Sequence, residues 1–329
     1  MENPLLELQE YENLQEALKK AKGPVQATGT LDSQKVHLMY WLGKDGGFPW
    51  KLVVTYDDQR AREIYDDFRS FTENVWLYPA KDLLFYSADI HGNLMTRQRI
   101  AVWRHLMEEK EGVVVTTLDG LMDHLLPLVF LKQQAVTVEN GQIMDLDEWK
   151  ERLTALGYER TAQVDGMGQF SIRGGIVDIF PLTEEVPVRI ELWDDEVDSI
   201  RSFDPESQRS VEQLEKITIY PSAETILTKK QLEAGIERLE KEEKEYEAAL
   251  RAKHQIEEAS RIRGIIKELT EGIRQGWKRD GLDAYIRYFC PETVSFLDYF
   301  PAGDTLICLD EPARLKEKGE TVEQEFRES

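Results

Sequence analysis

Cysteine and histidine are scarce in this chain. Its 329 residues include two cysteines, Cys290 and Cys308, and five histidines. Both cysteines stand in apolar surroundings, which favours small buried hydrophobic residues over a disulfide or a metal site. The histidines are scattered, without the spacing of metal ligands. We therefore expect no metal ion and no disulfide framework.

Long hydrophobic runs are missing as well. No apolar stretch approaches the length needed to cross a bilayer. The start, Met1-Glu2-Asn3-Pro4, has neither the basic residues nor the apolar core of a secretion signal. These absences predict a cytoplasmic protein without membrane contact.

Positive charge is in deficit. The 41 Lys and Arg residues face 63 Asp and Glu residues, so the formal net charge is −22. Binding to duplex DNA is driven by basic side chains that release counterions, and this acidity therefore disfavours direct DNA binding. A locally basic groove remains an alternative, and solubility is the simplest role of the acidity.

The first part of the chain alternates strands with helices. Apolar strands are expected at residues 52–56, 75–79 and 112–117, with helices after Asp57 and over 96–107. Continuous apolar strands that alternate with helices are typical of a parallel sheet.

The pattern changes near Pro127. One short helix ending near Gly157 is followed by short strands joined by turns, at 169–173, 176–180, 186–193 and 197–203. This is typical of a small antiparallel, β-rich α+β domain.

A long, highly charged helical region is expected over 228–273, after a strand at 217–221. Gly264 is a candidate interruption of this helix. A last apolar strand at 305–309 can rejoin the first sheet. The polar run 316–329 is either a frayed tail or a truncation within a longer protein.

These patterns predict an α/β protein whose parallel-sheet domain is split by the β-rich domain. The expected parts are residues 1–126 (α/β), 127–215 (inserted, β-rich) and 216–329 (helical, with the returning strand, packed on the first part).

A candidate phosphate loop lies between an expected short strand at Val25 and a helix. It consists of Thr28, Gly29, Thr30, Leu31, Asp32 and Ser33. A working loop needs Gly-Lys-Ser/Thr where Leu31-Asp32-Ser33 stand, because the lysine supplies the charge that binds phosphate. Asp32 places a negative charge there instead. The segment is either a relic loop or an ordinary strand–turn–helix, and neither predicts ATP binding.

Other candidate catalytic groups are weaker. Asp194-Asp195 is expected in a hairpin turn. Asp123 and His124 are sequence neighbours that diverge on a helix, and Ser171 lacks a nucleophile-elbow context. We expect no catalytic residue and no enzyme activity.

Strand alternation in the β-rich domain singles out Arg173, Arg189 and Trp193. Phe170 and Ile172 fall on one face and Arg173 on the other, while aliphatic residues alternate with Arg189 and Trp193 in the strand at 186–193. An exposed Arg–Arg–Trp cluster has the composition of a binding hot spot. The alternative is two surface arginines paired with Glu191 and Asp198, beside a half-buried Trp193.

The same region resembles a known family. The runs Gln169–Pro181, Arg189–Arg201 and Phe203–Arg209 are similar to the N-terminal region of the bacterial transcription-repair coupling factors (Mfd). A looser similarity extends to the excision-repair helicase UvrB.

The resemblance implies a UvrB-like module: a degenerate helicase-like domain derived from P-loop NTPases, called 1a and 1b, split by an inserted domain 2. Domain 2 of the family binds the repair protein UvrA through two arginines and an aromatic residue. The matching positions are Arg173, Arg189 and Trp193, although the family aromatic is often phenylalanine. The full-length family protein is an ATP-driven DNA translocase that removes stalled RNA polymerase, and its motor, with ATP and Mg, lies outside such a module.

A diverged UvrB-like, nucleotide-dependent helicase fragment is the alternative. UvrB has a working phosphate loop and an aromatic-rich hairpin that threads DNA. Leu31-Asp32 departs from that loop, and no such hairpin is found between Tyr86 and Arg97. Both differences favour the coupling factors.

Overall fold

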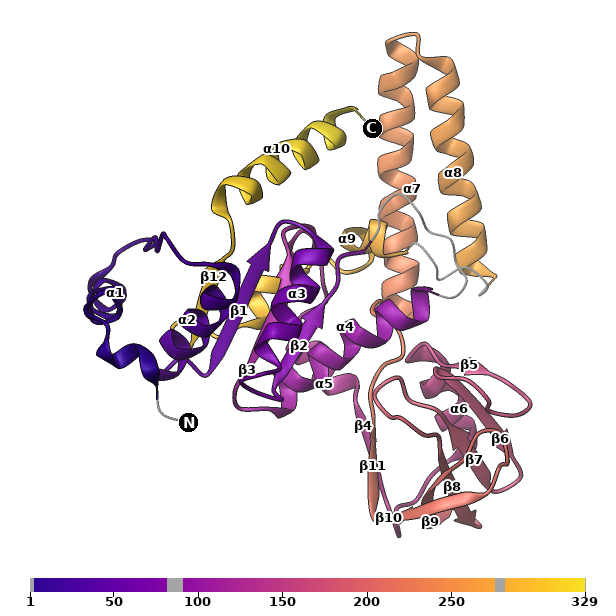
Figure 1. The fold of residues 1–329 in the computed structure, drawn as a ribbon. Helices are drawn as coiled ribbons and strands as arrows, with labels where there is room; N and C mark the ends of the chain where they lie inside the picture. The colour runs from indigo at the N-terminus through magenta and orange to yellow at the C-terminus, as the bar shows by residue number, and fades with distance from the viewer. Residues whose placement is uncertain (1–2, 82–90, 276–281, 329) are drawn as a thin grey trace. The chain divides into compact units, whose positions relative to one another are not determined.

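A computed structural model describes residues 3–81, 91–275 and 282–328. The chain divides into two compact units, one of residues 1–123 with 295–329 and the other of residues 124–294 (Figure 1). The second unit therefore interrupts the first in sequence. The three expected parts, with boundaries after 126 and 215, stay a prediction.

The first unit is built on a parallel sheet in the order β12-β1-β3-β2. Its strands are β1 (Trp50–Thr55), β2 (Val75–Tyr78), β3 (Gly112–Thr117) and β12 (Thr305–Leu309). β1 and β3 are buried along their whole length, as their apolar composition predicts. β12 pairs with β1 at the edge of the sheet, so the parallel sheet and the returning strand are both confirmed.

Helices accompany this sheet: α1 (Gln9–Lys20), α2 (Asp32–Asp45), α3 (Asp58–Phe68), α4 (His91–Glu108) and α10 (Pro312–Glu328). Short 3-10 turns are η1 (Pro4–Glu7), η2 (Asp119–Leu121) and η4 (Phe296–Tyr299). Asp57 caps α3 by accepting a hydrogen bond from the backbone N–H of Arg60. Ala61, Ile64 and Phe68 then form a buried cluster with apolar residues of β1, β2 and β3.

The second unit contains a six-stranded sheet in the order β10-β9-β8-β7-β6-β5. Its strands are β5 (Glu159–Arg160), β6 (Gln169–Arg173), β7 (Ile176–Ile179), β8 (Val188–Trp193), β9 (Glu196–Phe203) and β10 (Ser210–Leu214). All pairs are antiparallel except β5 with β6. Helix α6 (Leu146–Ala155), capped by Asp145, contributes Trp149 and Leu153 to the core of this sheet.

A separate two-stranded ribbon pairs β4 (Val136–Glu139) with β11 (Lys216–Ile219). The unit also contains α5 (Leu128–Gln134), η3 (Leu282–Tyr285) and α9 (Ile286–Phe289). β4 is followed by an Asn140-Gly141 turn, in which Gly141 adopts φ +81°. The strand that pairs with β4 lies about 80 residues further along the chain, so β4 and β11 are joined by a long connection.

The long charged region forms a hairpin of two helices, α7 (Lys229–Ala252) and α8 (Ile256–Arg274), which pack side by side (Figure 1). The expected interruption at Gly264 is wrong, because Gly264 lies inside α8 with open space around it. The chain reverses at residues 253–255 instead, where His254 adopts φ +63°. Packing between the two helices favours this turn over a continuous helix.

One expected strand, and the frayed-tail alternative for the polar run, need correction. Residues 24–28 form no strand, so the short strand at Val25 is wrong, although α2 begins at Asp32 as expected. The polar run after Lys316 is helical, as part of α10.

Much of the segment between Tyr86 and Arg97, where the sequence shows no aromatic-rich hairpin, lies outside the described residues. Within the described ranges, no helix has the length and apolar character to span a bilayer.

Candidate docking face of the six-stranded sheet

The two faces of the six-stranded sheet differ in chemistry. Phe170, Val177, Ile190 and Ile200 alternate onto one face, where they are fully buried with the apolar side of α6. The opposite, outer face contains the charged residues. The predicted division between aliphatic core and charged face is therefore confirmed.

The strand register brings Arg173 and Arg189 together around one carboxylate. β7 lies between β6 and β8, and its Asp178 stands directly opposite Arg189. Arg189 Nε donates to Asp178 Oδ1 over 2.6 Å, and Arg189 Nη2 donates to Oδ2 over 2.9 Å. Arg173 Nη2 donates to the same Oδ2 over 2.7 Å. Asp178 is completely buried, so the two guanidinium groups neutralise a charge that would otherwise be costly to bury.

Arg189 is held on several sides. Its guanidinium carbon lies 4.6 Å from the centre of the Phe203 ring, and Nη2 also donates to Gln208 Oε1 over 3.3 Å. The side chain is 16% exposed. Hydrogen bonds to Asp178 raise the pKa of Arg189 above its ordinary value. Arg189 thus forms a fixed, charged part of the outer face.

Arg173 and Trp193 are much more accessible. The Arg173 side chain is 49% exposed, and Asp178 is its one hydrogen-bonding side-chain partner among the described residues. Trp193 is 80% exposed at the end of β8, just before a turn in which Asp194 adopts φ +59°. The indole therefore offers apolar contact area, with a polar N–H, on the outer face.

The alternative in which Arg173 and Arg189 pair with Glu191 and Asp198 is wrong in this structure. Glu191 is bonded to Arg201 and Ser199, and the arginines of interest share Asp178 instead. Trp193 is largely exposed rather than half-buried.

Sequence reasoning missed Asp178. The signal is a single acidic residue within the apolar run Ile176-Val177-Asp178-Ile179. Alternation puts Asp178 on the face of Arg189, but the pairing that joins them depends on which strands are neighbours. The exposed Ile143 forms an isolated antiparallel β-bridge with Glu196, the residue opposite Trp193.

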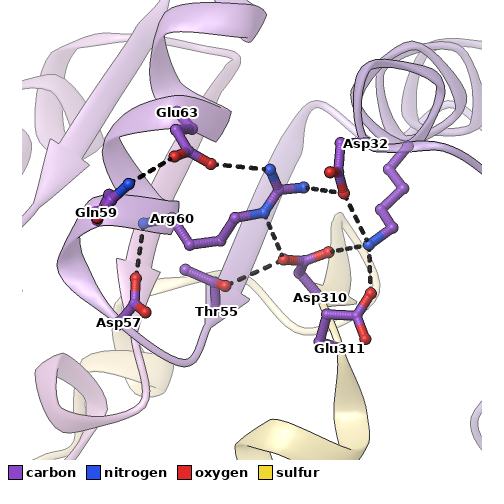
Figure 2. Close-up of polar contacts among 9 residues, drawn as sticks. Asp32, Thr55, Asp57, Gln59, Arg60, Glu63, Asp310 and Glu311 are labelled. Carbon is purple, nitrogen blue, oxygen red and sulfur yellow. Dashed lines mark hydrogen bonds and ion pairs between the residues drawn. The ribbon is translucent and has the colours of Figure 1, made fainter.

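The candidate phosphate loop takes an irregular path before α2. Gly29 adopts φ +85°, and Leu31 is exposed. Asp32 accepts hydrogen bonds at the first turn of α2, from Arg60 Nη2 over 3.1 Å (Figure 2). Thr28, Thr30 and Ser33 have no polar side-chain contact among the described residues.

A network of ion pairs lies beside this loop, at the carboxyl ends of β1 and β12 (Figure 2). Its centre is Asp310, a fully buried carboxylate. Asp310 Oδ2 accepts from Arg60 Nε over 3.0 Å and from the Thr55 hydroxyl over 3.1 Å. Asp310 Oδ1 accepts from Lys35 Nζ over 3.1 Å, and Lys35 also contacts Glu311 over 2.5 Å.

These partners set the ionisation of Asp310. Burial acts to raise its pKa, but the hydrogen bonds and charges of Arg60 and Lys35 outweigh burial and hold the pKa below its ordinary value. Both basic side chains are thus already engaged by carboxylates. A phosphate group at this end of the sheet would meet Asp310 and Glu311 and would have to displace them.

Comparison with known proteins finds a family whose model matches the part of the chain that contains the candidate docking face. Residues 136–224 match the model of the UvrB interaction domain, and this range contains β5 to β11 with Arg173, Arg189 and Trp193. The matched range is therefore similar to the UvrB interaction domain.

The chain as a whole, including this matched range, is also similar to known proteins. It is 34% identical over 279 residues to the transcription-repair-coupling factor of Bacillus subtilis, which covers 84% of this chain and 23% of the relative. The corresponding factors of Staphylococcus haemolyticus and Staphylococcus aureus are 31% and 32% identical over 280 residues, covering 83% and 82% of this chain. The resemblance to the transcription-repair coupling factors is confirmed. The chain spans less than a quarter of these relatives' length.

Proposed function

We propose that this chain is a non-catalytic docking module of a transcription-repair coupling factor, and that its UvrB interaction domain binds UvrA. The observation that carries the proposal is the outer face of the six-stranded sheet. There, Arg173 and Arg189 meet at Asp178 and Trp193 is exposed.

The chemistry of this face fits protein recognition. Arg and Trp are enriched among the residues that dominate binding energies, because both offer large contact areas with directional polar or π interactions. The guanidinium groups can make charge-assisted hydrogen bonds to a carboxylate or a carbonyl of UvrA. Trp193 supplies apolar area beside them.

Removing Arg173 should weaken the complex without harming the fold. We expect Arg173→Ala to reduce the UvrA binding free energy by about 1–3 kcal/mol, measured by calorimetric titration of purified UvrA into the chain. Arg152→Ala is the matched control, because Arg152 is an exposed arginine on α6 with no described side-chain partner. Equal affinities for Arg173→Ala and Arg152→Ala would refute the docking assignment.

The remaining steps belong to the whole protein. We propose that UvrA bound here is recruited to stalled RNA polymerase, and that other parts of the coupling factor contact polymerase and DNA. ATP and Mg would act in those other parts, where the translocase motor lies. This module would contact those other parts within the same polypeptide chain.

A nucleotide-dependent, UvrB-like helicase fragment is the competing function. The ion-pair network around Asp310 argues against it, because Lys35 and Arg60 already bind carboxylates and Asp32 adds another negative charge. Mg-ATP should leave the thermal midpoint of the chain unchanged. Clear stabilisation by Mg-ATP would favour the helicase fragment, and salt-dependent retardation of a DNA duplex would favour direct DNA binding.

A further inference from the structure

Asp178 stands out on the outer face because it is a completely buried acidic residue that no partner could touch directly. Both of its oxygens are used: Oδ1 by Arg189, and Oδ2 by Arg189 and Arg173 together. Every contact of Asp178 described above leads to one of the two arginines proposed to dock. Its influence on a partner must therefore pass through them.

The two arginines depend on Asp178 to different degrees. Arg189 has further contacts with Phe203 and Gln208, which keep it in place. Arg173 is half-exposed and has a long, flexible stem, so the bond to Asp178 restricts the orientation of its guanidinium. The shared oxygen also brings the two positive groups close together, which repulsion would oppose without the carboxylate.

Resting on the function proposed above, we infer that Asp178 is a positioning residue of the docking face, which aims the Arg173 guanidinium at an acidic group of the partner. The triad of two arginines and one aspartate has a net charge of +1. A positioning role and a purely electrostatic role of Asp178 therefore predict opposite changes in affinity when residue 178 is made neutral.

Asp178→Asn separates the two. It raises the triad charge to +2, which alone would strengthen attraction to an acidic partner. If Asp178 positions Arg173, the variant instead loses affinity, by about tenfold or more, through faster dissociation. Its association rate stays equal to that of the wild type or rises. A purely structural role would not separate the two rates in this way.

The experiment measures association and dissociation rates of purified UvrA on the immobilised full chain. Glu151→Gln is the matched control, because it makes the same change of charge on α6, whose apolar side packs on the opposite face of the sheet. Wild-type rates are expected for Glu151→Gln. Unchanged or tighter binding by Asp178→Asn would overturn the positioning role while leaving the docking function intact.

A second variant decides the matter if Asp178→Asn fails to fold, as a thermal melt would show. Arg173→Lys keeps the charge of the triad at a half-exposed position, but its ammonium lacks the planar fork that Asp178 would aim. We expect severalfold weaker binding, and wild-type affinity would overturn the inference. Failure of the wild-type chain to bind UvrA would refute the proposed function, and the inference with it.

Discussion

Each of the two units contains a buried carboxylate held by two basic side chains, and the comparison separates a structural cluster from the one that we propose docks UvrA. In the first unit, Asp310 binds Arg60 and Lys35, and both basic side chains are nearly enclosed. In the second, Asp178 binds Arg189 and Arg173, and Arg173 is half-exposed on the face that also carries the exposed Trp193. Ion pairs to a buried carboxylate stabilise the fold where both basic side chains are enclosed. Where one of the basic side chains is half-exposed, the same kind of ion pair holds it at the surface, accessible to a partner.

The comparison predicts the largest loss of stability at Asp310. Asp310→Asn would remove the buried carboxylate that Arg60 and Lys35 share and leave Arg60 with the more exposed Asp32 and Glu63, and we expect the free energy of unfolding to fall by about 3 kcal/mol. Urea denaturation measures this loss. UvrA binding by the remaining folded protein should be unchanged, and weaker binding would contradict the division of roles.

The stabilisation by Asp310 should also depend on pH. Its pKa is lowered in the folded state, so its contribution is fully present above its unfolded pKa of about 3.9 and is lost as the pH falls through the folded value. The difference in stability between the wild type and Asp310→Asn should therefore shrink below about pH 4. A difference that stays constant from pH 7 to pH 3 would exclude this ion pair as its source.

An intermediate effect is expected at Arg189. Arg189→Ala removes two of the three guanidinium bonds to buried Asp178 and the contact with Phe203. We expect it to lose about 1–3 kcal/mol of stability in addition to UvrA affinity. Arg173→Ala should lose affinity with a much smaller stability cost. Equal stabilities of the two variants in urea would show that the arginines are equivalent, against the contacts described here.

The smallest effect on folding is expected at Trp193. Because the indole is exposed, Trp193→Ser should change the free energy of unfolding by no more than about 0.5 kcal/mol. The same substitution should cost about 2 kcal/mol of UvrA binding if the indole is a hot spot. Calorimetry and denaturation on one preparation give both numbers. Wild-type affinity would leave Arg173 and Arg189 as the docking residues and remove Trp193 from the set.

Local pattern was enough to predict most strands and the outward trio. The apolar composition of β1 and β3 and the period-two alternation of β6 and β8 are local properties of the chain, and the structure agrees with both. Pairing between distant segments was harder to predict. Asp178 joins Arg173 to Arg189 only because β7 lies between β6 and β8, and Asp310 meets Lys35 across 275 residues of sequence.

Helix ends and irregular segments were also beyond local pattern. The sequence stays highly charged from residues 240–245 into α8, so composition does not mark the reversal at His254. The reversal depends on packing between α7 and α8. Val25 has the β-branched side chain of a strand former, yet the segment finds no neighbouring strand to pair with. In both places the outcome depends on whether distant segments of the chain pack or pair, which local propensity does not determine.

The return of β12 to the edge of the parallel sheet has a consequence for synthesis on the ribosome. The six-stranded sheet and the helical hairpin lie in one continuous segment, residues 124–294, which can emerge and fold while the growing chain is still attached. The first unit must wait, because Arg60 and Lys35 leave the exit tunnel long before Asp310 does. Until then these cations lack their buried partner and the edge of β1 is open, so the nascent first unit is the part most exposed to misfolding and to chaperones.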